Sequence, residues 1–114
     1  MRTGAFFWHT LTLQAAMLAA GSLPVFGADA DDVRMGRALA ARICAECHAI
    51  RPADVHSPNA NAPSFEDIAA TAGMTPLALK VALRSSHREM PNLILNEDET
   101  DQIIAYILSL PGDR

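Results

Sequence analysis

Apolar and polar residues along the chain follow a helical period, and no stretch follows the two-residue period of a strand. In the first periodic segment, over 31–47, small and apolar residues recur every three or four positions: Val33, Gly36, Ala40, Ile43, Cys44 and Cys47. These positions share one helix face. Asp31 or Asp32 is the expected N-cap, because a carboxylate there pairs with free backbone amides and with the positive end of the helix dipole.

A loop and a short helix are expected next. Residues 49–63 contain three prolines and have no periodicity, which is typical of a loop. Ser64, with Asp67 three residues later, predicts the start of a short helix that ends near Gly73.

Two further helices complete the pattern. Thr75-Pro76 predicts an N-cap and first helical residue, with the helix running to about residue 86. Asn96 with Glu99 three positions later predicts the start of the last helix, which ends before Pro111-Gly112. Its apolar face carries Ile103, Ile104, Ile107, Leu108 and Leu110. The pattern therefore predicts an all-α chain of about four short helices.

The first 27 residues have the layout of a secretory signal peptide. Arg2 is followed by a weak apolar run that ends at Pro24, and small residues precede two candidate cleavage sites, after Gly27 and after Ala30. Polar residues interrupt the run, so it lacks the roughly 18 to 20 apolar residues of a membrane span. We expect export with cleavage of 1–27, and one domain over 28–114. An uncleaved membrane anchor is the alternative.

Without this leader the chain is short of bulky core residues. Four of the six aromatic residues lie before residue 28, so Phe65 and Tyr106 alone serve the remaining 87 residues. A domain of this size buries little surface, so we expect an apolar group other than its own side chains to complete the core. Loss of Arg2 with the leader changes the net charge from −4 to −5. An acidic chain with no basic block is a poor nucleic-acid binder.

Both cysteines fall in one motif, Cys44-Ala45-Glu46-Cys47-His48, which is the attachment signature of c-type haem. Two thiols at this spacing can each add to one vinyl group of the same macrocycle, and His48 can then reach the iron. A thioredoxin-like motif would need a βαβ framework, and a zinc site would need two more ligands. A haem held between helices also supplies the apolar body that the composition lacks.

With this motif the sequence resembles the class I c-type cytochromes, which are small single-haem electron carriers. The resemblance covers 31–111 and implies the cytochrome c fold: about four short helices around one covalent haem c, with the first and last helices crossing. Gly36 stands eight residues before Cys44, where the family has a glycine at that crossing. Ile104-Ala105-Tyr106 resembles the family's apolar-Ala-Tyr run. Gly36 is therefore expected to meet Tyr106 or Ile103.

The resemblance implies that His48 and Met90 are the two axial ligands of the iron. Met90-Pro91 stands shortly before the last helix, as the family's methionine ligand does. A neutral, soft thioether raises the reduction potential relative to a second imidazole. His87, Met74 and an open sixth position are the alternatives.

Further haem contacts follow from the same resemblance. Pro63 is expected to accept the His48 imidazole N–H through its carbonyl, although Ala62 stands where the family usually has glycine. Phe65 and Leu83 are expected to line the haem crevice. Arg84, Arg88, Lys80 and Asn61 are candidate donors to the propionates, and Arg84 is included in the expected haem site.

The resemblance implies a periplasmic single-electron carrier that is not an enzyme, because two axial ligands leave no open position for substrate or oxygen. One alternative is a haem-based ligand sensor or small peroxidase with an open sixth site. Another is a dedicated cytochrome subunit of a dehydrogenase or oxidase complex. We expect a monomer whose electron donor and acceptor proteins dock transiently at the haem edge, with no nucleic-acid partner and no stable membrane insertion.

Overall fold

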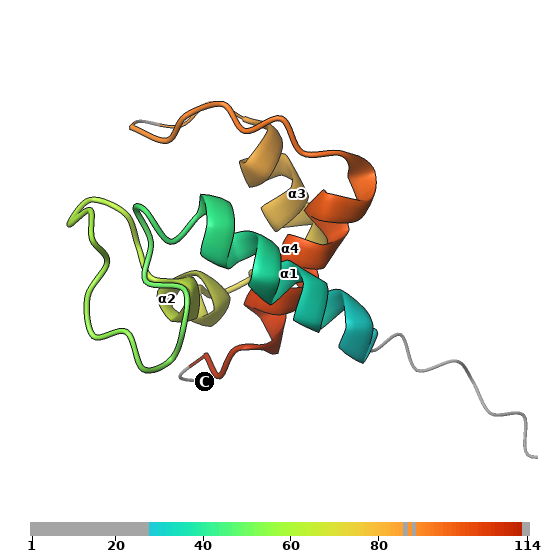
Figure 1. Cartoon of the computed structure of the whole chain (residues 1–114), viewed down its shortest axis with the longest axis horizontal. Coiled ribbons are helices and arrows are strands. Elements are labelled where there is room, and N and C mark those ends of the chain that lie inside the picture. Colours follow the sequence, from blue (N-terminus) through green and yellow to red (C-terminus); the bar gives the residue numbers. More distant parts are fainter. Residues whose placement is uncertain (1–27, 86, 88, 113–114) are drawn as a thin grey trace, which may run out of the picture.

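The computed structural model describes residues 28–85, 87 and 89–112 and consists there of four helices without a strand. The helices are α1 (Ala30–Ile43), α2 (Phe65–Ala70), α3 (Pro76–Arg84) and α4 (Glu97–Ser109) (Figure 1). The expected all-α fold is confirmed. The signal peptide expected over 1–27 lies outside the described residues.

The starts of three helices follow the local capping signals. Ser64 accepts a hydrogen bond from the Asp67 amide at 3.0 Å, and Thr75 caps the helix that Pro76 begins. Asn96 and Glu99 form the expected capping box. These three predictions are confirmed, because each cap needs only residues within one turn.

The predicted bounds of α1 are wrong at both ends. Its N-cap is Asp29, whose side chain accepts from the Asp31 amide, so neither expected aspartate is the cap. The helix ends at Ile43 and not at residue 47. The amides of Cys44 and Ala45 both donate to the Ala40 carbonyl, at 2.9 and 3.0 Å, and the regular register stops there.

The helices α2 and α3 also end earlier than the sequence suggested, whereas α4 ends before Pro111 as expected. α2 ends at Ala70 instead of near Gly73: the Thr71 amide donates to Ile68, and the Thr71 hydroxyl donates to the Asp67 carbonyl. α3 ends at Arg84, where the Ser85 hydroxyl donates back to the Val81 carbonyl. Serine and threonine hydroxyls compete for backbone groups in this way at helix ends.

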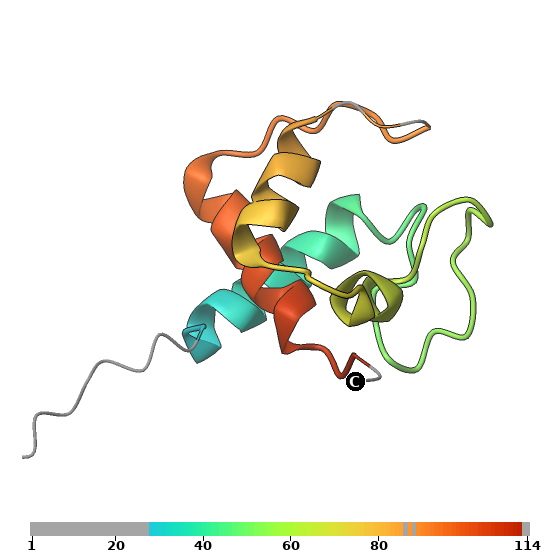
Figure 2. The same cartoon turned by 180° about the vertical axis from the view of Figure 1, so that it is seen from behind.

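The centre of the fold is the crossing of α1 over α4 (Figures 1 and 2). A Cβ atom at Gly36 would lie 1.9 Å from the Gln102 carbonyl oxygen and 2.9 Å from the Tyr106 Cβ. Only glycine permits this approach of the two backbones. The predicted contact between Gly36 and Tyr106 is confirmed, and it includes the α4 backbone at Gln102.

A core of buried residues surrounds this crossing. Leu39 and Ala40 of α1 pack with Ile103 and Ile107 of α4, and Phe65 of α2 joins them. Within the described part of the chain, no helix combines the length and the apolar character that a bilayer crossing requires.

Candidate functional site

An apolar cavity of about 310 Å³ lies beside this core. The turn after α1, the 59–63 loop, the three later helices and the 87–93 segment all contribute to its wall. Seven of the eight residues assigned to the haem site line it: Cys44, Cys47, His48, Pro63, Phe65, Leu83 and Met90. Positions 46 residues apart in the chain, from Cys44 to Met90, thus meet at one cavity.

A larger hollow of about 640 Å³ lies between α1 and the loop after His48. Arg37, Arg51 and Asp54 line it, and it includes neither cysteine nor Met90. The smaller cavity is therefore the candidate site, because it joins the attachment motif to the methionine.

A tight turn presents the two cysteines to the cavity. The amides of Cys47 and His48 both donate to the Cys44 carbonyl, at 3.1 and 2.9 Å. No disulfide joins the two cysteines, and burial raises the pKa of the Cys44 thiol to about 11.

The His48 ring is oriented by the loop opposite it. Its Nδ1 lies 2.7 Å from the Pro63 carbonyl oxygen, which can only accept, so Nδ1 carries the proton. In the neutral ring Nε2 is then left free as a ligand atom. The Phe65 ring lies 5.6 Å from the His48 ring, centre to centre, and tilts against it. The hydrogen bond that the resemblance implies is thus present.

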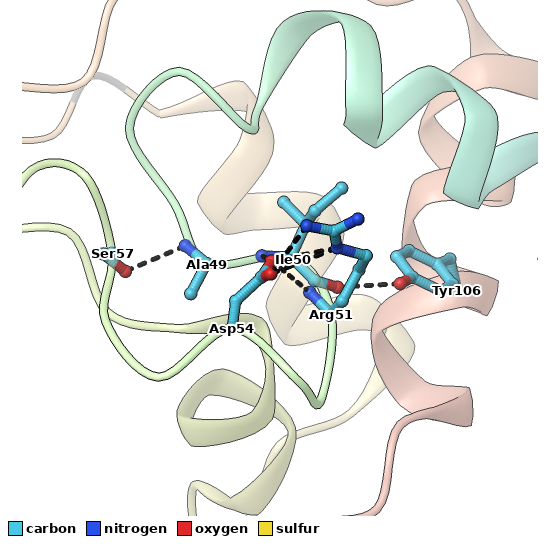
Figure 3. A network of polar contacts seen from close by, with 6 residues as sticks. All are labelled: Ala49, Ile50, Arg51, Asp54, Ser57 and Tyr106. Carbon is cyan, nitrogen blue, oxygen red and sulfur yellow. Dashed lines mark hydrogen bonds and ion pairs between the residues drawn. The ribbon is translucent and has the colours of Figure 1, made fainter.

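An ion pair folds the segment that follows His48 (Figure 3). The Asp54 carboxylate accepts from the Ile50 and Arg51 amides at 3.2 and 3.1 Å, and from the Arg51 guanidinium at 2.8 Å. The side-chain hydrogen bond from Arg51 holds the pKa of the Asp54 carboxyl below its usual range. The turn is therefore closed by a carboxylate that stays charged.

Two further hydrogen bonds attach this segment to the rest of the fold (Figure 3). The buried Tyr106 hydroxyl of α4 donates to the Ile50 carbonyl at 2.7 Å. The Ala49 amide donates to the Ser57 hydroxyl at 2.9 Å. Because Ala49 follows His48 directly, both bonds restrict the backbone that carries the imidazole.

Met90 approaches the cavity on a separate segment. Its amide donates to the His87 carbonyl at 3.2 Å, which closes a turn, and its side chain is half-buried. His87 and Pro91 line the cavity beside it. Residues 89–95 and the 49–63 loop extend to the same side of the helices in both views (Figures 1 and 2).

Arg84 is the one expected haem-site residue that is not part of the cavity wall. Its exposed guanidinium pairs with Glu97 of α4, and it is absent from the cavity wall. Lys80 is likewise engaged, with Glu97 and Asp101. Of the other candidate propionate donors, Asn61 lines the cavity and Arg88 lies outside the described residues. The role of Arg84 toward a propionate stays a prediction, and its ion pair with Glu97 is what the structure shows.

The residues present fit a covalent haem c. Two free thiols, an imidazole with its Nδ1 proton engaged and a thioether line one cavity whose remaining wall is mostly apolar. The sequence pattern places Ile103 and Ile107 on the apolar face of the last helix and gives no role to Glu89, although all three residues line the cavity. No local signal points to Glu89, because its place there depends on a turn that tertiary contacts shape.

Comparison with known proteins agrees with the geometry. The family model for cytochrome c matches residues 33–111. Cytochrome c-552 of Bradyrhizobium diazoefficiens is 35% identical over 81 residues, which cover 71% of this chain and 77% of that protein. No solved structure matches the chain.

Proposed function

Because the chain belongs to the cytochrome c family and carries one haem c thioether-linked to Cys44 and Cys47, we propose that it is a periplasmic single-electron carrier with His48 and Met90 as axial ligands. One observation carries the proposal. The attachment motif and Met90, from segments far apart in the chain, line the same apolar cavity.

When bound, the haem supplies a one-electron couple between ferric and ferrous iron. The chain's own part begins with His48. The hydrogen bond from His48 Nδ1–H to the Pro63 carbonyl fixes the tautomer and the orientation of the imidazole. It also raises the basicity of the imidazole as a ligand. Met90 contributes a neutral, soft sulfur, which favours the ferrous state more than a second imidazole would.

The cavity wall has a separate task. Phe65, Leu79 and Leu83 present hydrocarbon to the cavity and exclude water from it. A dry wall disfavours the more highly charged oxidised state and so raises the potential. Two protein ligands also leave no position for substrate or oxygen, which supports a carrier and not an enzyme.

The partners we propose are redox proteins that dock briefly. Electron-transfer encounters need only a small interface. The net charge of −5 after removal of the leader favours partners with a basic patch, because complementary charge mainly raises the rate of encounter. The composition of residues 1–27 supports export to the periplasm, where haem of this kind is attached.

The test is a visible absorption spectrum of the ferric holoprotein and of its Met90→Ala variant. The wild type should be low-spin and show the weak far-red band of a methionine sulfur on ferric haem, and Met90→Ala should lack that band. A high-spin wild type would instead support the open-site sensor or peroxidase. A low-spin wild type without the band would make His87 the ligand to test.

A further inference from the structure

A side-chain hydrogen bond joins the two loops that face each other across the candidate haem site. The Asn61 Nδ2 donates to the Glu89 Oε2 at 2.9 Å, over a separation of 28 residues. Asn61 belongs to the loop whose Pro63 carbonyl holds His48, and Glu89 directly precedes Met90. Both residues line the cavity.

The Glu89 side of this contact is conformationally disfavoured. Its φ angle is +67°, and it is the one residue other than glycine with a positive φ in the described part of the chain. It lies within the turn that the Met90 amide closes on the His87 carbonyl. Such a turn favours glycine or asparagine at a left-handed position. A strained residue of this kind persists only where its surroundings hold it.

The Asn61 side is well anchored. Its amide donates to the Asn59 side chain at 2.9 Å, and the Ala62 amide donates to the Asn59 carbonyl at 3.0 Å. The Asn59 amide donates in turn to the Cys47 carbonyl at 3.1 Å. The donor is thus tied to the attachment motif, whereas its partner Glu89 belongs to the less regular segment that carries Met90.

We propose that Asn61 and Glu89 form a latch that holds residues 89–91 against the cavity and keeps the Met90 sulfur in place. Both are positioning residues, and the proposal rests on the ligation by Met90 proposed above. Opening of the segment would release the backbone strain at Glu89, and the hydrogen bond from Asn61 opposes this release. The latch therefore sets how often Met90 leaves its position.

The opening rate can be measured with imidazole as the probe. When ferric holoprotein is mixed with a large excess of imidazole, the limiting rate of Met90 replacement reports the opening of the segment. Asn61→Ala and Glu89→Ala should each raise this rate about tenfold, the effect of one charge-assisted hydrogen bond on an exposed site. The double variant should be no faster than either single variant, because the two changes remove one interaction.

Two conservative variants separate the hydrogen bond from other effects. Glu89→Gln keeps an oxygen acceptor for Asn61 but loses the charge assistance, so its rate should lie between those of the wild type and Glu89→Ala. Asn61→Asp keeps the size of the side chain and sets two carboxylates against each other, so it should open faster than Asn61→Ala. Asn61→Asp also keeps the experiment informative if Asn61→Ala does not yield folded holoprotein.

Glu66→Ala is the matched control for charge. Glu66 lies in the first turn of α2, outside the cavity wall, and its loss removes the same negative charge. No hydrogen bond or ion pair joins Glu66 to Asn61 or Glu89 among the described residues, so the rate of Glu66→Ala should stay within about twofold of wild type. Equal acceleration by Glu66→Ala and Glu89→Ala would overturn the latch in favour of a charge effect.

Two other results would also overturn it: single variants at the wild-type rate, or a double variant near a hundredfold, the product of two independent tenfold effects. Failure of the proposed ligation is recognised separately. In that case the wild type itself lacks the far-red methionine band and Met90→Ala leaves the spectrum unchanged, whereas failure of the latch alone leaves the band present.

Discussion

At the scale of single residues, the buried Tyr106 hydroxyl links α4 to the segment that follows His48. Tyr106→Phe removes the donor and leaves the Ile50 carbonyl buried without its partner. We expect the free energy of unfolding of the ferric holoprotein to fall by about 1–2 kcal/mol, the usual cost of such a loss. Guanidinium unfolding followed by circular dichroism measures it.

Ser109→Ala is the control for this hydroxyl. The Ser109 hydroxyl donates to the Tyr106 carbonyl at 2.7 Å from an exposed position at the end of α4. Water can replace the Ser109 hydroxyl, so Ser109→Ala should lower the free energy of unfolding by less than about 0.5 kcal/mol. If Tyr106→Phe costs no more than Ser109→Ala, the hydroxyl does not anchor the segment.

Some features of the site follow from a local sequence motif, and others depend on contacts between residues far apart in the chain. Cys44, Cys47 and His48 were predictable because their spacing alone encodes the chemistry. The contact from Tyr106 to Ile50 spans 56 positions, and no local pattern encodes it. The ion pair between Arg84 and Glu97, 13 positions apart, is likewise not visible from the sequence.

At the scale of elements, the α1–α4 crossing depends on Gly36. An alanine Cβ at Gly36 would meet the Gln102 carbonyl at 1.9 Å, which forces the two backbones apart. We expect Gly36→Ala to lower the free energy of unfolding of the holoprotein by about 3 kcal/mol or more, the upper range for overpacking. Thermal unfolding followed by circular dichroism is the measurement.

Gly73→Ala gives a comparison without a clash. No atom lies within 4 Å of a Cβ at Gly73, but its φ of +78° is left-handed. Gly73→Ala should lower the free energy of unfolding by the backbone strain alone, about 1–2 kcal/mol. A Gly36→Ala variant as stable as Gly73→Ala would show that α1 and α4 can separate without penalty.

The ion pairs between α3 and α4 should stabilise the fold less at low pH. The Lys80 ammonium lies 2.7 Å from the Glu97 carboxylate, and this hydrogen bond, together with Arg84, lowers the pKa of Glu97 from 4.5 to about 2. The unfolded chain therefore takes up this proton first as the pH falls. The contribution of Glu97 is complete above about pH 4.5 and is lost as the pH falls through about 2.

Glu97→Gln tests this linkage. Its holoprotein should be less stable than wild type at pH 7, and the difference in urea midpoint should vanish as the pH falls below about 2. Asp98→Asn is the control, since no hydrogen bond or ion pair engages the Asp98 side chain among the described residues. A difference that persists unchanged at low pH, or an equal effect of Asp98→Asn, would contradict the role of the ion pairs.

Helix starts were more predictable than helix ends, for a physical reason. Ser64, Thr75 and Asn96 each cap a helix with a side chain that reaches one turn. The end of α1 at Ile43 depends instead on two amides that share the Ala40 carbonyl, so that the chain can turn toward the cavity. Periodicity continued through Cys47 because the same small and apolar residues suit both the helix and the cavity wall.

At the scale of the whole molecule, the core is divided between side chains and cofactor. The α1–α4 crossing buries its own residues, but Phe65 and Leu79 contact both this core and the cavity. Composition had already indicated a missing apolar body, since two aromatic residues serve the part of the chain after the leader. Composition alone does not indicate where that body lies, because its wall comes from separated segments; the attachment motif and the family resemblance place it.

This division predicts that the chain without haem is largely unfolded. A cavity of about 310 Å³ with a mostly apolar wall would be exposed to water, and a domain of this size has little other burial to offset that cost. The Cys44→Ala/Cys47→Ala variant should show weak helical circular dichroism and no cooperative thermal transition. Met90→Ala keeps the covalent haem and loses only one proposed ligand, so it should retain the helical circular dichroism and the cooperative thermal transition. Native-like cooperative helix in the double cysteine variant would mean that α1 and α4 suffice for the fold.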